Sequence, residues 1–326
     1  MPSSLIDRFS EYIIRSAGDR IAEGMGGRGN FCILNYHRIL DRKDPLLDSE
    51  PDVSTFRWHM KALAENFNVL SLSDALEMLE NGHLPPRAVC VTFDDGYRSI
   101  HDLALPVLVE YKIPATIFVS TGYLDGENMW NDRIIEAARI LPEGPLDLSE
   151  IGLGIYTVPS LNRRKNMIDF LIDSAKYLPT DTRLNLPAKL ENFNGNVQTA
   201  HLMLTREMVI ALSKRGVEIG GHTVSHPILT SLTNDESKYE ITQCKVELEK
   251  LIGKPVTLFA YPNGKKDVDF DERHAKMVSE AGYVAAFTTA IGAVNATNDN
   301  FHLPRSRPWD STPMFFKLRL LRWLAK

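Results

Sequence analysis

The chain has 326 residues, of which 44% are hydrophobic and 24% are charged, and its formal net charge is −5. This balance is typical of a soluble globular protein that is long enough to bury a sizeable core. The mild negative charge, with no broad basic stripe outside the last residues, gives no reason to expect nucleic acid as a partner.

The cysteines and the N-terminal region indicate the cellular compartment in which we expect the protein. Cys32, Cys90 and Cys244 are widely spaced and odd in number, which fits neither a disulfide framework nor a CxxC metal site. Residues 1–30 carry several charges and no apolar stretch of signal-peptide length. No run approaches the roughly 20 apolar residues of a membrane span. We therefore expect a cytoplasmic protein with buried, reduced thiols.

Strand and helix patterns alternate along the first part of the chain. In order, they predict an amphipathic leader helix over 5–24, a strand over 31–37, helices over 54–65 (with Ser54 as N-cap) and 73–82, a strand over 88–93, a helix over 100–111 and a strand over 115–120. Residues 140–204 then interrupt the alternation. They are rich in Pro, Asn and Leu, predict one helix over 163–177, and are too long for a simple βα loop.

The alternation resumes after this insertion. The predicted elements are a helix over 205–214, a strand over 217–220, a helix over 235–251, a strand over 256–260, a helix over 271–281 and a strand over 283–288. This order indicates parallel βα units and one barrel-like α/β domain of about seven strands. We divide the chain into a leader over 1–30, a barrel over 31–310 with its insertion at about 140–204, and a C-terminal helix over 311–326.

Polar residues follow four of the predicted strands. They are Asp94 and Asp95 after strand 88–93, His222 and His226 after strand 217–220, Tyr261–Gly264 after strand 256–260, and His37 at the end of strand 31–37. In α/β barrels the chemistry lies at the C-terminal ends of the strands. We therefore expect these side chains to converge on one site.

The types of these residues fit a metal-assisted hydrolysis. His222 and His226 are four residues apart, and on one face of a helical turn such a pair can chelate one divalent ion. A carboxylate from another strand completes three protein ligands and leaves a position for water, which the ion activates. A second carboxylate can serve as general base. Asp94 and Asp95 can divide these two roles because adjacent side chains point in different directions.

Three segments resemble the first motifs of a known family, the polysaccharide deacetylases with a NodB-homology domain, which are the family-four carbohydrate esterases. The segments are Thr92–Gly96 (TFDDG), His222–His226 (HTVSH) and Phe259–Gly264 (FAYPNG). The resemblance runs from about Phe31 to Pro308, interrupted by the insertion, and the first two motifs are highly specific. Tyr36-His37 and the Tyr-Pro-x-Gly pattern resemble one branch of that family.

The resemblance implies a deformed (β/α)7 barrel with an insertion. It implies metal-dependent removal of N-acetyl groups from amino sugars of a polysaccharide or a lipid-linked glycan precursor. By the same resemblance, Asp95, His222 and His226 bind the metal, usually zinc, and Asp94 is the base that activates water. The metal and a backbone N–H at or near Asn263 would hold the tetrahedral oxyanion.

Two departures from the family pattern concern the neighbours of the catalytic base. Many members have an Arg where Ala260 stands, and that Arg steadies the catalytic Asp; Arg305 or Arg307 is a possible replacement. Many members also carry a late Leu-x-His whose His protonates the leaving amine, whereas this chain has Phe301-His302-Leu303. His37 and His302 are the remaining choices for the general acid, and the predicted strand end favours His37.

Other residues are weighed between packing and substrate contact. We place Tyr261, Asn263, Trp130 and Arg305 among the substrate-binding residues, although packing accounts equally well for Trp130. In the tail over 315–326, helical periodicity groups Arg319, Arg322 and Lys326 on one face, and Phe316, Leu320, Trp323 and Leu324 on the other. Such a helix either contacts a membrane peripherally or packs on the barrel or a partner subunit.

Three functions stay open from the sequence. The first is N-deacetylation of a glycan, and the second is removal of an O-acetyl or formyl group, or opening of a cyclic amide, at the same site. The third is a non-catalytic glycan-binding barrel. The two departures from the family pattern, at Ala260 and at Phe301-His302-Leu303, favour this alternative. Two histidines and one carboxylate can also hold iron for oxygen chemistry, but the adjacent Asp94 favours hydrolysis.

Overall fold

The computed structural model describes residues 29–176, 178, 180–193, 195, 200–308 and 310–325. These residues form two compact units, each described by itself below. The barrel unit comprises the chain up to Arg42, Ser49–Leu124 and the chain from Leu204 onward, and the insertion unit comprises Lys43–Asp48 and Asp125–Met203. The leader helix predicted over 5–24 lies outside the described residues.

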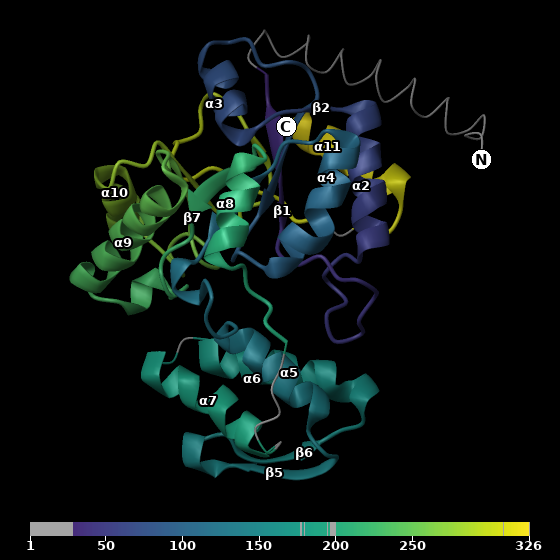
Figure 1. Ribbon diagram of the computed structural model, residues 1–326, viewed down its shortest axis with the longest axis vertical. Helices are drawn as coiled ribbons and strands as arrows, with labels where there is room; N and C mark the ends of the chain where they lie inside the picture. Colours follow the sequence, from purple (N-terminus) through teal and green to yellow (C-terminus); the bar gives the residue numbers. More distant parts are fainter. Residues whose placement is uncertain are drawn as a thin grey trace. The chain divides into compact units, whose positions relative to one another are not determined.

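The barrel unit is built around a curled, mostly parallel sheet (Figure 1). Its path is β10-β1-β3-β4-β7-β8-β9, with β2 paired to β3. The strands are β1 (Phe31–Tyr36), β2 (Asn68–Val69), β3 (Ala88–Phe93), β4 (Thr116–Val119), β7 (Glu218–Gly221), β8 (Leu258–Ala260), β9 (Ala285–Phe287) and β10 (Ala293–Val294). Of the strands in the described part of the chain, β10 alone runs antiparallel to its neighbour in this sheet.

The segment Leu303–Ser306 closes the sheet into a barrel. Leu303 bridges to Phe287 of β9, and Ser306 bridges to Leu34 of β1, both in parallel orientation. Backbone hydrogen bonds complete these contacts, among them Ser306 N to Ile33 O at 2.8 Å. Among the described residues, six parallel strands and this segment therefore form one continuous ring. The deformed (β/α)7 barrel is confirmed.

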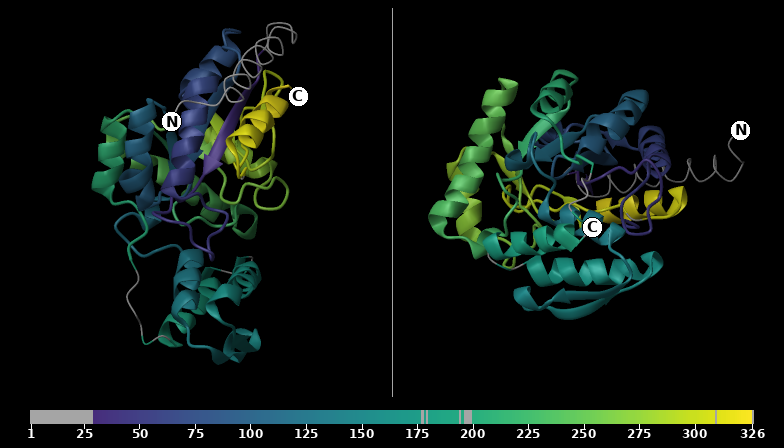
Figure 2. Two further views of the ribbon diagram at one scale, coloured as in Figure 1. Left: turned by 90° about the vertical axis from the view of Figure 1, so that its right-hand side faces the viewer. Right: turned by 60° about the horizontal axis from the view of Figure 1, so that its bottom comes forward.

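Helices cover the outside of the ring, as the turned views also show (Figure 2). They are α2 (Val53–Asn66), α3 (Leu72–Glu80), α4 (Leu105–Tyr111), α8 (Arg206–Lys214), α9 (Asn234–Ile252) and α10 (Glu272–Glu280), with short helical turns at η1 (Ile100–Ala104), η2 (Thr121–Tyr123) and η5 (Leu229–Ser231). The predicted elements match these to within a few residues. The cap of α2 differs, because Asp52 and not Ser54 accepts the hydrogen bond from Thr55 N.

β1 and β3 are buried on both faces, which explains their almost continuous apolar sequences. Alternate residues such as Ile33, Cys90, Phe118 and Phe287 form one core cluster of the barrel unit. Gly220 is required where β7 passes Phe118, because a Cβ there would lie 2.5 Å from the Phe118 ring. The sheet can therefore curl tightly at β7, the strand that precedes His222.

The C-terminal helix α11 (Pro313–Leu324) packs on the barrel. Phe316, Leu320, Trp323 and Leu324 are buried, and the Phe316 ring stacks on His59 of α2 with 4.7 Å between ring centroids. The apolar face that the sequence left open to a membrane is thus covered by the protein itself. Among the described residues, no helix is both long enough and apolar enough to cross a membrane.

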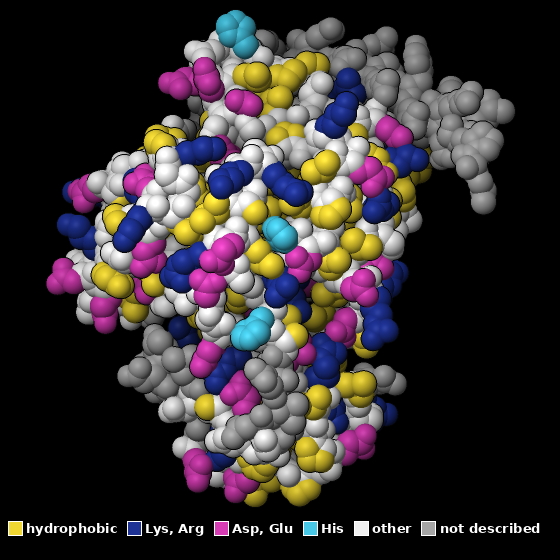
Figure 3. All heavy atoms as spheres, in the orientation of Figure 1, with side chains coloured by type: hydrophobic (Ala, Val, Ile, Leu, Met, Phe, Trp, Pro, Cys, Tyr) yellow, Lys and Arg dark blue, Asp and Glu magenta, His cyan; other side chains and the backbone are white. Residues whose placement is uncertain are grey.

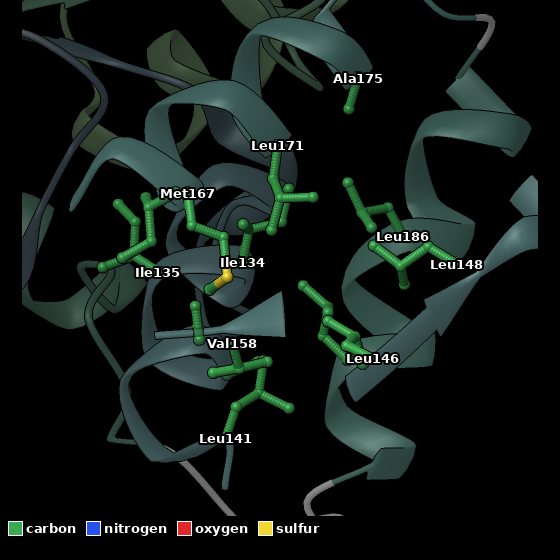
Figure 4. Close-up of a cluster of buried hydrophobic side chains, with 14 of the residues drawn as sticks. Ile134, Ile135, Leu141, Leu146, Leu148, Val158, Met167, Leu171, Ala175 and Leu186 are labelled. Atoms are coloured by element: carbon green, nitrogen blue, oxygen red, sulfur yellow. The ribbon is translucent and has the colours of Figure 1, made fainter. Parts of the chain in front are cut away.

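The insertion unit has its own core. It contains a hairpin of β5 (Gly144–Leu148) and β6 (Gly154–Val158), the helices α5 (Trp130–Ile140), α6 (Arg164–Lys176) and α7 (Thr180–Phe193), and the turns η3 (Ser149–Ile151) and η4 (Leu161–Arg163). Ile134, Leu146, Met167 and Leu171 point toward one another in this core (Figure 4). The sequence predicted only the second of these three helices. Proline at 187 and weak amphipathicity hid α7.

Charges of both signs are interspersed among the described residues on the face shown in Figure 3. This mixture agrees with the small net charge of −5. All three cysteines are free and buried, which the apolar surroundings of Cys32 and Cys90 predicted for those two.

Acid stability should depend on His59, whose side chain is buried between α2 and α11. Burial lowers the pKa of His59 to about 3. Below the unfolded-state pKa of about 6.5, the unfolded chain binds a proton that the folded chain does not, so stability falls as the pH falls. Between pH 7 and pH 5 this group should cost about 2 kcal/mol of unfolding free energy.

The variant His59→Asn should lack that share of the pH dependence. Urea unfolding of both proteins at pH 7 and pH 5 measures it, and the other titrating groups cancel in the comparison. Equal pH dependence of the two proteins would show that His59 is not held neutral in the fold.

Candidate active site

The register of the sheet brings the motif residues to one edge of the barrel. Tyr36 pairs with Phe93, so that His37 and Asp94 leave the sheet side by side, and Asp94 N donates to Tyr36 O at 2.9 Å. Val119 pairs with Gly221, and His222 N donates to Val119 O at 3.1 Å. The convergence of strand ends predicted from the sequence is therefore observed.

The Asp94–Gly96 turn directs two adjacent carboxylates to different neighbours. Asp94 continues the inward-facing alternation of Cys90 in β3, whereas Asp95 has a left-handed φ of 74° and turns away. Gly96 follows with φ of 90°, a conformation that favours glycine. The strained turn is what lets one strand end supply two separate functional groups.

His222 and His226 come together in a loop and not in the helical turn that their spacing suggested. Thr223 and His226 have left-handed φ values of 65° and 52°, and the Thr223 side chain accepts a hydrogen bond from His226 N at 3.1 Å. The chain folds back between the two histidines, and their ring centroids lie 4.9 Å apart.

Asp95, His222 and His226 form a group whose ligand atoms all lie within 4.8 Å of one another. Asp95 Oδ1 is 3.3 Å from the Nε2 atom of each histidine. His222 Nδ1 lies 2.7 Å from Ala260 O, so Nδ1 carries the proton and Nε2 presents its lone pair. That buried Nε2 has no hydrogen-bond partner among the described residues. An orphaned imidazole nitrogen beside a carboxylate fits a bound cation.

The charges of this group are mutually dependent. Burial alone would raise the pKa of Asp95, but contact with His222 and the charge of His226 hold it well below its usual range. Burial would lower the pKa of His222, and the carboxylates of Asp94 and Asp95 raise it instead. Both carboxylates therefore need positive charge nearby, which protons or a divalent cation can supply.

Arg305 forms a bidentate ion pair with Asp94. Its Nη1 lies 2.6 Å from Asp94 Oδ1 and its Nη2 lies 2.8 Å from Oδ2. Asn35 Nδ2 donates to the same carboxylate at 3.0 Å. Burial would raise the pKa of Asp94, yet the charge of Arg305, together with His222, keeps it below the usual value. Asp94 is thus ionised at neutral pH.

The structure distinguishes between the two arginines that the sequence left open. Arg305 is 1% exposed and occupies the barrel interior from the closing segment, whereas Arg307 pairs with Glu50 at the surface. Regular alternation would put both arginines on one face, but Arg307 lies beyond Ser306, which bridges the segment to β1, and so leaves the sheet. Arg305 was placed among the substrate-binding residues; in the structure its guanidinium is buried against Asp94.

Asn35 is a site residue that the sequence analysis missed. It lies in β1 two residues after Ile33, facing the same interior, and its side chain contacts both Asp94 and Arg305. A polar residue near the C-terminal end of an otherwise apolar strand was the available signal.

The structure also separates the two candidate general acids. His37 lies close enough to both aspartates that its charge contributes to lowering their pKa values. His302 instead pairs with Asp299 at 3.3 Å and lies 3.6 Å from Glu272. The strand-end argument thus holds for the position of His37.

Two of the predicted substrate-binding residues are occupied in packing. Tyr261 is buried, stacks on Phe270 with ring centroids 3.7 Å apart, and donates from its hydroxyl to Phe301 O at 3.1 Å. Trp130 belongs to the core of the insertion unit, with Arg183 over its ring. Asn263 is half-buried with a left-handed φ of 59°.

Comparison with known proteins identifies the family of this chain. A family model described as polysaccharide deacetylase matches residues 81–152 and 174–286, which is more than half of the chain. A poly-β-1,6-N-acetyl-D-glucosamine N-deacetylase of Staphylococcus epidermidis is 26% identical over 207 residues, covering 57% of this chain and 70% of the relative. The protein of the same name from Staphylococcus aureus is 34% identical over 147 residues, covering 40% of this chain and 49% of the relative.

Solved structures share the fold. The Streptococcus pyogenes deacetylase PplD in complex with acetate superposes with a TM-score of 0.59 and 20% identity, covering 90% of this chain and 98% of that one. IcaB from Ammonifex degensii gives a TM-score of 0.59 and 18% identity, covering 91% and 98%. These structural likenesses show the fold, and the family model shows the family. The chain spans about half the length of the Staphylococcus aureus relative.

The Arg305–Asp94 pair should be strongly coupled in stability. Arg305→Met leaves Asp94 buried without its partner, which should cost about 3–5 kcal/mol. In the double variant with Asp94→Asn the loss should fall short of the sum of the single losses by about 1–3 kcal/mol. Urea unfolding at pH 7 measures all four proteins.

Arg307→Met is the matched control, two residues further along the same segment. Its pair with Glu50 is partly exposed, and losing it should cost about 0–1 kcal/mol. If the losses of unfolding free energy in the Arg305 and Asp94 variants simply add, the two side chains are not energetically coupled and the prediction is contradicted.

Proposed function

Because this chain belongs to the polysaccharide deacetylase family, we propose that it hydrolyses N-acetyl groups of amino sugars in a glycan, using a divalent metal ion. The observation that carries the proposal is the Asp95–His222–His226 group with an ion-paired Asp94 directly beside it. The Asp95–His222–His226 group supplies three metal ligands, and Asp94 supplies a carboxylate that is kept ionised.

The donor set suits zinc. Two imidazole nitrogens and one carboxylate oxygen are the ligands of hydrolytic zinc sites, in which a fourth position stays open. The hydrogen bond from His222 Nδ1 to Ala260 O fixes the tautomer that such a ligand requires. When bound, the ion would polarise the acetamide carbonyl and lower the pKa of a water molecule.

Asp94 is the proposed general base. Arg305 and Asn35 hold its carboxylate in one orientation. Oδ2 accepts from both residues, whereas Oδ1 accepts from Arg305 and keeps a second lone-pair direction for a water proton. Because the pair with Arg305 lowers its pKa, Asp94 remains a proton acceptor across the neutral range. Its accompanying positive charge also stabilises the anionic form after each turnover.

His37 and Asn263 complete the proposed roles. His37 leaves β1 beside Asp94 and is half-buried, so its imidazole can deliver a proton to the departing amine. The backbone N–H of Asn263, held in a left-handed conformation, is the proposed second donor to the oxyanion. Such a donor is effective because its orientation is fixed before substrate binds.

The proposed substrate is a polymeric N-acetylated glycan or its lipid-linked precursor. The staphylococcal relatives are named for poly-β-1,6-N-acetyl-D-glucosamine, and an N-acetylglucosamine oligomer is therefore the first substrate to test. An O-acetyl ester is the alternative that the same residues could attack.

Replacing Asp94 by Asn should reduce acetate release from N-acetylglucosamine oligomers by at least about 100-fold, because a general base typically contributes 10²–10⁴-fold. The three metal ligands are unchanged in this variant, so the metal content should stay at the wild-type level. Acetate assays and elemental analysis of the same sample test both parts. Substantial surviving activity would refute the role of Asp94.

Removing the metal should abolish the activity reversibly. Chelation followed by dialysis should stop acetate release, and added zinc should restore it, whereas His226→Ala should bind zinc weakly and recover little. The same preparations are assayed on matched N-acetylated and O-acetylated oligosaccharides. Faster release from the O-acetylated substrate would replace the N-deacetylase assignment by an esterase.

A further inference from the structure

We propose that Glu240, in the middle of α9, is a positioning residue for the metal ligand His226. It acts through the backbone of the loop Thr223–His226, which it holds in a strained conformation. The inference rests on the proposed metal site and assigns a role to a residue outside the sequence motifs.

Glu240 is nearly buried, at 9% exposure, and its carboxylate faces the loop. Oε2 accepts hydrogen bonds from Val224 N and from Ser225 N, both at 2.8 Å. Oε1 accepts from the Ser225 hydroxyl at 2.6 Å. The Glu240 carboxylate thus accepts from two consecutive backbone N–H groups and from the Ser225 hydroxyl, all of which lie between the two histidines. Bonds to an ionised carboxylate are the strong kind.

The loop needs this support because its backbone is strained. Thr223 and His226, which flank the two residues bound by Glu240, both have left-handed φ values. A β-branched threonine in that region is a genuine outlier. Such conformations persist only where the surroundings determine them.

The opposite side of the same loop is held by the segment after β4. Thr121 N donates to Thr223 O at 3.2 Å and Gly122 N to Val224 O at 2.8 Å. A Cβ on Gly122 would lie 2.8 Å from that carbonyl, so the approach requires glycine. The carbonyls are therefore fixed by η2 and the amides by Glu240. Loss of either side frees the loop.

His226 depends on this arrangement more than His222 does. His222 extends from β7 and is fixed directly by bonds to Val119 O and Ala260 O. His226 lies beyond Glu240's contacts, and its N–H donates to Thr223 Oγ1, which belongs to the same loop. Removing Glu240 should therefore loosen one metal ligand and leave two in place.

Helix α9 is a firm anchor for such a role. A capping box at Thr233 and Glu236 fixes its start, and Cys244 and Leu248 continue its buried face beside β7 (Figure 1). Glu240 interrupts that apolar face with a charge, which is unfavourable unless the charge is fully bonded. The three bonds to the loop meet this requirement.

The test compares Glu240→Ala, Glu240→Gln and the control Glu247→Ala. Glu247 lies two turns later on α9 and bonds to Gln243 one turn before it. Zinc affinity is measured by competition with a chromogenic chelator, and the cobalt-substituted proteins are compared by visible absorption. Glu240→Ala should raise the zinc Kd by about 10–100-fold, the usual effect of losing a residue that orients a ligand, and should alter the cobalt spectrum.

Glu240→Gln should recover most of the affinity. Its amide oxygen can accept from both backbone N–H groups, and its NH2 can donate to the Ser225 hydroxyl. Glu247→Ala should bind zinc like the wild type. A Glu240→Ala protein that is folded and keeps wild-type affinity and cobalt spectrum overturns the proposal.

Should Glu240→Ala fail to fold, Ser225→Ala decides the question, because it removes one of the three bonds without leaving a buried charge unbonded. It should weaken zinc binding by a few fold, which is the order expected for one hydrogen bond, and unchanged affinity overturns the proposal. His226→Ala separates the two levels of inference. If wild type and His226→Ala bind zinc equally, the proposed metal site itself is wrong.

Discussion

The buried ion pair between Arg305 and Asp94 is the interaction on which the proposed site depends. A guanidinium and a carboxylate in a barrel interior are stable only as a well-bonded pair, and here two short contacts and Asn35 supply the bonds. Arg305 belongs to Leu303–Ser306, the segment that joins β9 to β1 and closes the barrel. The segment that closes the barrel therefore also holds Asp94, the proposed general base.

A second constraint is backbone strain at the edge of the barrel. Asp95, Thr223, His226 and Asn263 all have left-handed φ values, and all four lie in the motif loops. Such residues cost free energy, and the structure offsets it with dense bonding, as at Glu240. A site fixed in this way places ligands before metal or substrate arrives, which reduces the reorganisation required during catalysis.

At one departure from the family pattern, the arginine beside the base comes from a different position in the chain. Ala260 stands where many members carry the arginine that steadies the base, and the small side chain joins the apolar core while its carbonyl orients His222. The guanidinium arrives instead from the closing segment at Arg305. His302, which does not match the family's late histidine motif, is paired with acidic side chains. The absence of two motif residues is therefore no evidence for a non-catalytic barrel.

The sequence alone determined the strands, the barrel and the four residues Asp94, Asp95, His222 and His226. The strands and the polar residues at their ends follow from local patterns, because near-continuous apolar runs that end in polar residues are properties of short segments. The expected roles of the four residues came from the motif resemblance. Only the tertiary structure decided between Arg305 and Arg307, revealed the loop in place of a helical turn, buried Tyr261 and covered the apolar face of α11. Those outcomes depend on contacts between residues far apart in the chain, such as Arg305 with Asp94, and no local periodicity encodes which distant partner fills a given space.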